Sequence, residues 1–212
     1  MKSLIFRVTG ARAEPYAAVP TLMFRLSIEE TSGEHVESIA LRCQIRIEPQ
    51  KRPYSAAEEQ GLVELFGETP RWGDTLKPFL WTHVSTVVQG FNSQTAIELP
   101  VPCTYDLEVA AAKYFHALDD GEIPILFLFS GTVFVRTEAG LRVHQVPWDK
   151  EAPYRLPVRV WRELMDAYYP QSGWLRLHRD TLSGLTRFKA RRALATWDDV
   201  VDALLTEAEG MR

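Results

Sequence analysis

Residues 39–47 read Ile-Ala-Leu-Arg-Cys-Gln-Ile-Arg-Ile, and large apolar residues or Cys43 occupy every odd position. A period of two places alternate side chains on opposite faces of a β-strand, so one face of this stretch is dry and the other is wet. Leu22, Phe24, Leu26 and Ile28 repeat the pattern earlier in the chain. The two stretches predict half-buried strands of an antiparallel β-sandwich.

Other segments extend this reading in both directions along the chain. Further strands are predicted at 4–8, 79–89, 95–101, 106–109, 125–135 and 141–146. The stretch 125–135 is apolar at successive positions, which favours a central strand covered on both faces. Pro15 and Pro20 predict that residues 10–20 form a loop or a short edge piece.

Helix signals interrupt the strands and then dominate the last quarter of the chain. Ser55 and Glu58 match a capping box, Gly67 can end the helix that follows, and 110–118 predicts another short helix. Beyond Pro157, apolar residues recur at helical spacing in three segments, the third starting at Thr196. We therefore predict an α+β fold: an antiparallel, immunoglobulin-like β-sandwich over residues 1–157 with a short inserted helix, and a C-terminal helical subdomain over residues 158–212 packed on it.

Composition limits the classes of function. The net charge of −4 over 212 residues gives no general reason to expect nucleic acid as a partner. No apolar run reaches the roughly 20 residues of a membrane helix, and Arg7 interrupts the first apolar stretch too early for a signal peptide, so we expect a cytoplasmic protein. In that compartment Cys43 and Cys103 are expected to be reduced, buried thiols, although an inter-sheet disulfide would suit a sandwich.

The sequence contains few signals of catalysis. The five histidines stand singly, without a second His or a Cys within four residues, so no metal site and no cofactor is predicted. His83 lies among hydroxyl residues and is either a catalytic histidine or a half-buried strand residue. The acidic cluster from Asp119 to Glu122 is either a cation site or a solvated turn.

Two segments are candidates for protein binding. The loop 69–75 contains Arg71, Trp72 and Asp74, and loops that contain such side chains often carry function. In the C-terminal region, Arg187 and Arg191 are four residues apart and share one face of a helix. That basic face could meet nucleic acid, a protein partner, or the acidic helix that follows it. We take it as the centre of a protein-docking patch.

Four stretches together resemble one known family: residues 16–24, 40–49, 66–76 and 146–152. The chain is similar over nearly its whole length to an uncharacterised actinobacterial family, domain of unknown function 6084. The resemblance implies no assigned activity and no catalytic residues. It also implies an association with gene clusters of uptake NiFe-hydrogenases, and therefore an accessory or maturation role.

These observations lead to one functional expectation and one alternative. We expect a non-enzymatic, protein-binding accessory or assembly factor, with a hydrogenase or its accessory proteins as partner, and without nucleic acid or membrane as a ligand. The alternative is an enzyme with a site near His83 or near Asp119–Glu122. An enzyme requires polar groups that converge in a concave cleft, whereas a binding module presents an apolar or aromatic surface.

Overall fold

A computed structural model describes residues 3–104, 106, 109–137, 140–170, 172 and 176–210. The chain forms two compact units, residues 1–173 and 174–212. The first unit contains two antiparallel sheets with helices at one end, and the second unit consists of two helices joined by a short turn. The predicted α+β fold, a sandwich with helices in the C-terminal region, is confirmed.

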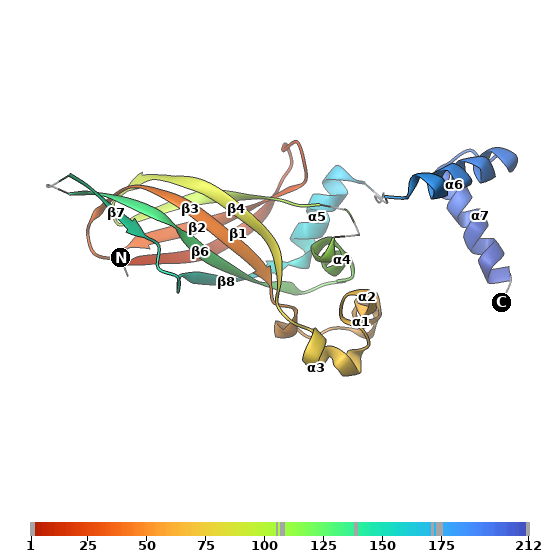
Figure 1. Cartoon of the computed structure of the whole chain (residues 1–212), viewed down its shortest axis with the longest axis horizontal. Coiled ribbons are helices and arrows are strands. Elements are labelled where there is room, and N and C mark those ends of the chain that lie inside the picture. Colours follow the sequence, from red (N-terminus) through yellow and green to blue (C-terminus); the bar gives the residue numbers. More distant parts are fainter. Residues whose placement is uncertain are drawn as a thin grey trace. The chain divides into compact units, whose positions relative to one another are not determined.

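The smaller sheet contains β1 (Leu4–Glu14), β2 (Thr21–Glu30) and β5 (Gln94–Pro102), in the order β1-β2-β5. The larger sheet contains β4 (Phe79–Phe91), β3 (His35–Ile47), β6 (Glu122–Thr137) and β7 (Gly140–Gln145) in that order. A further strand, β8 (Glu151–Pro157), pairs with the first half of β6. All pairs are antiparallel, and Figure 1 shows the strands of both sheets.

The decisive strand β3 lies in the middle of the larger sheet, between β4 and β6. Cys43, for example, pairs with Val84 on one side and with Phe129 on the other. The five odd-numbered residues from Ile39 to Ile47 are at most 2% exposed, whereas Ala40 and Arg42 are exposed. The period of two therefore identified the core face correctly.

Two parts of the sandwich differ from the sequence prediction. Strand β1 continues to Glu14, beyond the predicted end at residue 8, because a bulge between Val8 and Gly10 shifts its register against β2 without ending the pairing. Strand β8 was not predicted, since Pro153 and Pro157 argue against a strand; it pairs with β6 alone, and prolines are tolerated on such edge strands. Of the predicted strand 106–109, residues 107–108 lie outside the described residues and Val109 caps a helix.

Gly131 marks the point on β6 where its partner changes from β8 to β7. The glycine has a φ of +143°, and a Cβ built there would lie 2.1 Å from the carbonyl oxygen of Ala40. Its own carbonyl oxygen accepts a hydrogen bond from the Val146 backbone N–H at 2.9 Å. Only glycine permits this close approach of β6 to β3, so the local backbone requires this residue.

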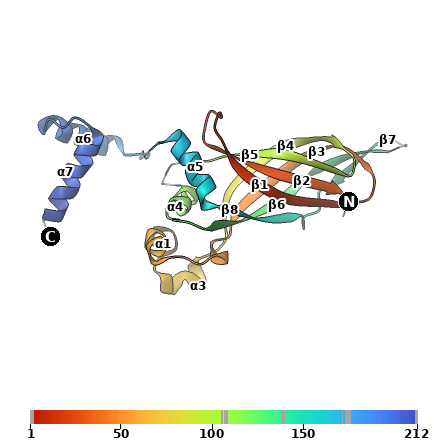
Figure 2. The ribbon, with the colours of Figure 1, turned by 180° about the vertical axis from the view of Figure 1, so that it is seen from behind.

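The helices of the first unit gather at one end of the sandwich (Figures 1 and 2). Between β3 and β4 lie α1 (Ala56–Gly61), α2 (Val63–Phe66) and α3 (Trp72–Thr75); α4 (Ala110–His116) follows β5, and α5 (Val158–Tyr168) follows β8. Trp161, Leu164 and Met165 of α5 are buried in the core of this unit. We had predicted that the helical subdomain begins at residue 158, but α5 belongs to the first unit because this apolar face packs there.

The second unit is a hairpin of α6 (Arg179–Arg191) and α7 (Trp197–Gly210). Ala193, just beyond the C-cap of α6, has a φ of +52°, and the Leu194 N–H donates to the Lys189 carbonyl, as in a Schellman turn. Helix α7 begins with the predicted capping pair, in which the Asp199 N–H donates to the Thr196 hydroxyl and the Thr196 N–H donates to the Asp199 carboxylate. The turn between the two helices is therefore defined by its own hydrogen bonds.

Candidate functional site: an apolar cavity at the helical end

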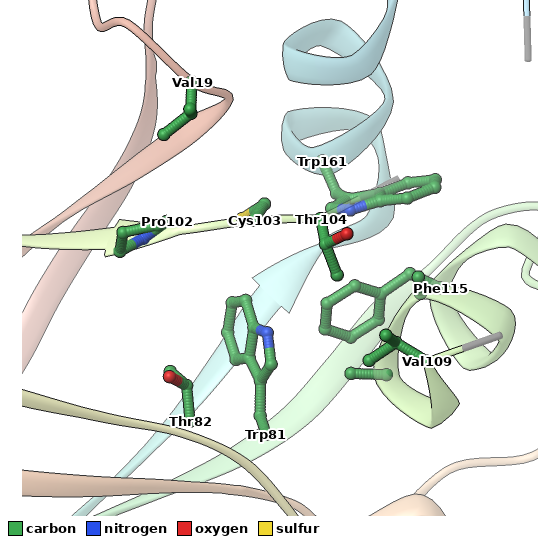
Figure 3. Close-up of a pocket in the computed structure, with 11 residues that line it drawn as sticks. Val19, Trp81, Thr82, Pro102, Cys103, Thr104, Val109, Phe115 and Trp161 are labelled. Atoms are coloured by element: carbon green, nitrogen blue, oxygen red, sulfur yellow. The ribbon is translucent and has the colours of Figure 1, made fainter. Parts of the chain in front are cut away.

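A cavity of about 320 Å³ lies where strands of both sheets end and helices begin. The end of β5, the start of β4, and helices α4 and α5 supply its walls, as Figure 3 shows. The lining residues are Val19, Trp81, Thr82, Pro102, Cys103, Thr104, Val109, Ala111, Ala112, Phe115 and Trp161. Its size is at the lower end of the range of about 300–1,000 Å³ that is usual for ligand pockets.

Aromatic rings form the deep part of this cavity. Phe115 lies between the two tryptophans, with its ring centroid 5.0 Å from that of Trp81 and 5.7 Å from that of Trp161, and both contacts are edge-to-face. Phe115 and Trp161 are buried, and Trp81 is half-buried. Edge-to-face packing holds rings at defined angles, so the wall presents a preformed apolar surface.

The rim of the cavity is also apolar, but it is accessible. Val19, in the turn between β1 and β2, is 50% exposed, and Val109, at the N-terminus of α4, is 40% exposed. The β1–β2 turn is anchored to α5 by Tyr168, whose hydroxyl lies 2.9 Å from the carbonyl oxygen of Glu14 and 2.8 Å from that of Ala17. The cavity therefore opens to solvent between two apolar side chains.

The chemistry of the walls does not suit acid–base catalysis. None of the described lining residues carries a charge at neutral pH. Burial raises the pKa of the Cys103 thiol to about 12, against a smaller lowering by a backbone hydrogen bond at Leu22, and its Sγ lies 3.5 Å from the Val101 carbonyl oxygen. A thiol in this state is not a nucleophile, because the thiolate is the reactive form.

A buried ion pair links α1 to the turn that follows α4, one of the helices that line the cavity. Arg52 and Glu58 form a 2.7 Å contact, and their side chains are only 7% and 5% exposed. The Glu58 carboxylate also accepts hydrogen bonds from the backbone N–H of Ser55 at 2.9 Å and of Asp119 at 3.0 Å. Because Asp119 lies in the turn between α4 and β6, Glu58 connects α1 to the segment that follows α4.

The predicted contact loop at residues 69–75 divides into a structural part and an exposed part. Trp72 is half-buried: its indole N–H donates to the Gly67 carbonyl at 2.9 Å, and its ring packs edge-to-face on Tyr54 at 5.2 Å. Arg71 and Asp74 are exposed. Trp72 thus holds the loop in place, and the charged side chains of Arg71 and Asp74 face solvent. The role of these residues in binding stays a prediction.

The predicted basic stripe on α6 is exposed. Among the described residues, neither Arg187 nor Arg191 forms an ion pair, whereas Arg192 pairs with Glu207 of α7 and lies over the Phe188 ring at 5.0 Å. The helical spacing of Leu182, Leu185 and Phe188 predicts that all three pack inward. Leu185 and Phe188 are half-buried, but Leu182 is exposed.

The residues of the enzymatic alternative do not line the cavity. His83 is exposed on β4, opposite Gln44 of β3. Asp119, Asp120 and Glu122 are exposed in the turn before β6. In the described part of the chain, no three His, Cys, Asp or Glu side chains are grouped as a metal site needs, and none of its helices is long and apolar enough to cross a bilayer.

Sequence reasoning missed this cavity, because its walls come from five distant segments. Trp81 and Trp161 are two of the six tryptophans of the chain, and their number alone does not show which of them meet. Trp174, another of the six, lies outside the described residues. The two adjacent alanines Ala111 and Ala112 could have indicated the cavity, because small buried residues on a helix leave room beside large aromatic side chains.

Comparisons with known proteins give little beyond the family. No curated protein matches the chain. A solved structure of a β-glucosidase from Kluyveromyces marxianus is 6% identical, with a TM-score of 0.26, and the match covers 72% of this chain and 14% of that one. A TM-score of this size carries no inference about fold or activity. The model of a family of unknown function matches residues 1–212, so the chain belongs to the family of unknown function DUF6084.

Proposed function

We propose that the protein is a non-enzymatic binding protein, an accessory or assembly factor, and that its cavity receives an apolar side chain of a partner protein. The observation that carries this proposal is the composition of the cavity: aromatic walls, an apolar rim and no described lining residue that is charged at neutral pH. Preformed pockets of this kind commonly hold the apolar anchor residues of an interface.

The identity of the partner is proposed from the family resemblance. The implied association with uptake NiFe-hydrogenase genes suggests a hydrogenase or one of its accessory proteins as the partner, with the cytoplasm as the place of action. The exposed residues Arg71 and Asp74 are proposed as additional charged contacts, and Arg187 with Arg191 is proposed as a separate protein-docking patch. Charged groups at the edge of an interface chiefly affect the rate of association and the choice of partner.

The test fills the cavity without altering its chemistry. Ala112 is buried and lines the cavity, so Ala112→Met places a longer apolar side chain in it. Ala110 is an exposed residue of the same helix that does not line the cavity, and Ala110→Met is the matched control. Both variants and the native chain are used as baits in the native host, with mass spectrometry of the recovered proteins and a thermal melt of each bait.

The expected result is loss of one specific protein from the Ala112→Met bait and its retention by the Ala110→Met bait, at similar melting temperatures. Recovery of the same proteins by all three baits would contradict the role of the cavity. Binding of a small molecule with turnover by the native chain would contradict the non-enzymatic proposal itself.

A further inference from the structure

The helical hairpin of the second unit leaves much apolar surface uncovered. In α6 and α7, Val200 alone is buried, whereas five large apolar side chains are 37–56% exposed: Leu182, Trp197, Val201, Leu204 and Leu205. Units of fewer than about 40 residues rarely bury enough surface to be stable without a partner or a covalent link. The hairpin therefore needs something to cover this surface.

The exposed apolar residues of α7 form one stripe. Trp197, Val201, Leu204 and Leu205 follow the i, i+4, i+7, i+8 spacing that places side chains on one face of a helix. The Lys189 ammonium of α6 lies 5.9 Å from the Trp197 ring centroid, so one end of this stripe lies next to α6. The turn between the helices is held by its own hydrogen bonds, which keeps the stripe in a defined position on the hairpin.

The two helices carry opposite charges. Helix α6 contains four basic residues and one acidic residue, and α7 contains five acidic residues and no basic one. Within the described hairpin one ion pair joins the helices, between Arg192 and Glu207. Most of the opposite charge on α6 and α7 is consequently left without an ion pair inside the hairpin.

We propose that the hairpin pairs with the hairpin of a second copy of this chain, with its apolar stripe buried between them and α6 of each copy facing α7 of the other. In a dimer with a two-fold axis, every contact between two surfaces occurs twice, once in each direction, so the interface must be self-complementary. When α6 of each copy faces α7 of the other, each basic helix meets an acidic helix. If α6 faced α6 and α7 faced α7, like charges would meet. The two hairpins then form a four-helix arrangement with an apolar interior.

The first experiment measures the mass of the full chain in solution by sedimentation over a wide range of protein concentration. The expected result is a species of twice the chain mass of 24.2 kDa. Leu205→Asp should raise the dissociation constant of that species at least about 30-fold, the effect of losing a central apolar contact. Thr206→Asp adds the same charge at the next, also exposed, residue of α7, off the stripe, and should leave the dissociation constant nearly unchanged.

The second experiment tests the pairing of α6 with α7 and does not depend on the folding of one variant. One variant makes both helices acidic through Arg179→Glu, Arg187→Glu and Arg191→Glu. The other reverses the charge of α7 through Asp198→Lys, Asp202→Lys and Glu209→Lys, so that both helices are then basic. Each variant alone should remain a monomer, and an equimolar mixture should form a one-to-one dimer.

Three results would overturn the proposal. One is a native chain that stays monomeric at all concentrations, as it would if the stripe were covered by another part of the same chain or by a different protein. Another is a native dimer that Leu205→Asp and Thr206→Asp weaken equally. The third is a mixture of the two charge variants that associates no better than either variant alone.

Discussion

Replacing Glu58 by Gln should destabilise the first unit strongly, because it removes one partner of a buried ion pair. The change keeps the shape of the side chain and deletes its charge, so the Arg52 guanidinium, 7% exposed, loses its compensating carboxylate. Breaking a buried pair in this way costs about 3–5 kcal/mol, a large part of the roughly 5–15 kcal/mol of a typical domain.

The pH dependence of the same pair follows from the pKa of Glu58. Burial alone would raise that pKa, but the hydrogen bonds from the Ser55 and Asp119 backbone and the charge of Arg52 together lower it below its ordinary value of 4.5. The stabilisation is therefore complete above about pH 4.5 and is lost as the pH falls through the lower folded pKa. The difference in stability between the native chain and Glu58→Gln should accordingly shrink in strong acid.

Urea unfolding followed by circular dichroism measures both effects. With a slope of about 3 kcal/mol/M, the midpoint of Glu58→Gln should fall by about 1–1.7 M at pH 7. Glu68→Gln is the control, because Glu68 is exposed on the following loop, and its effect should stay within about 0.5 kcal/mol. A loss below about 1 kcal/mol for Glu58→Gln would refute the reasoning, since Arg52 would then not depend on this carboxylate.

Four other tests probe the rest of the chain. Gly131→Ala should lower the free energy of unfolding by on the order of 3 kcal/mol in the same assay, because of its φ of +143° and the nearby Ala40 carbonyl; an unchanged value would mean that the strand shifts freely. Burial raises the pKa of Cys43 and Cys103 to about 12, so a thiol reagent should react with neither in the native chain at pH 7 and with both in urea. Replacing both Arg187 and Arg191 by Glu should leave the melting temperature of the first unit unchanged. A lower melting temperature would indicate that these arginines form ion pairs with that unit. Titration of Zn²⁺, Ni²⁺ or Fe²⁺ should reveal no stoichiometric site of micromolar affinity, and tight one-to-one nickel binding would favour a metal chaperone instead.

The sandwich was predictable because its signals are local. The period of two around Cys43, the capping box at Ser55 and Glu58, and the stop at Gly67 act within a few residues, and each is present in the structure. Strand β8 was not predictable from propensity, since its two prolines are tolerated only because β6 alone pairs with it.

The candidate site could not be predicted in the same way. Trp81, Cys103, Phe115 and Trp161 are far apart in sequence, and they meet because β4, β5, α4 and α5 end or begin at one end of the sandwich. The combination of Arg71, Trp72 and Asp74 favoured a contact role for the loop 69–75, but the Trp72 ring packs on Tyr54. Local patterns indicate which faces are buried, but convergence of distant segments depends on topology.

The most direct test of the binding proposal places a photoreactive phenylalanine analogue at Val109, on the rim of the cavity. The control position is Val87, an exposed valine on β4 that does not line the cavity. Irradiation in the native host should attach one partner protein at Val109 and not at Val87, and Ala112→Met should abolish the cross-link. Attachment of the same protein at Val87 alone, or a Val109 cross-link that persists in Ala112→Met, would contradict a partner side chain in the cavity.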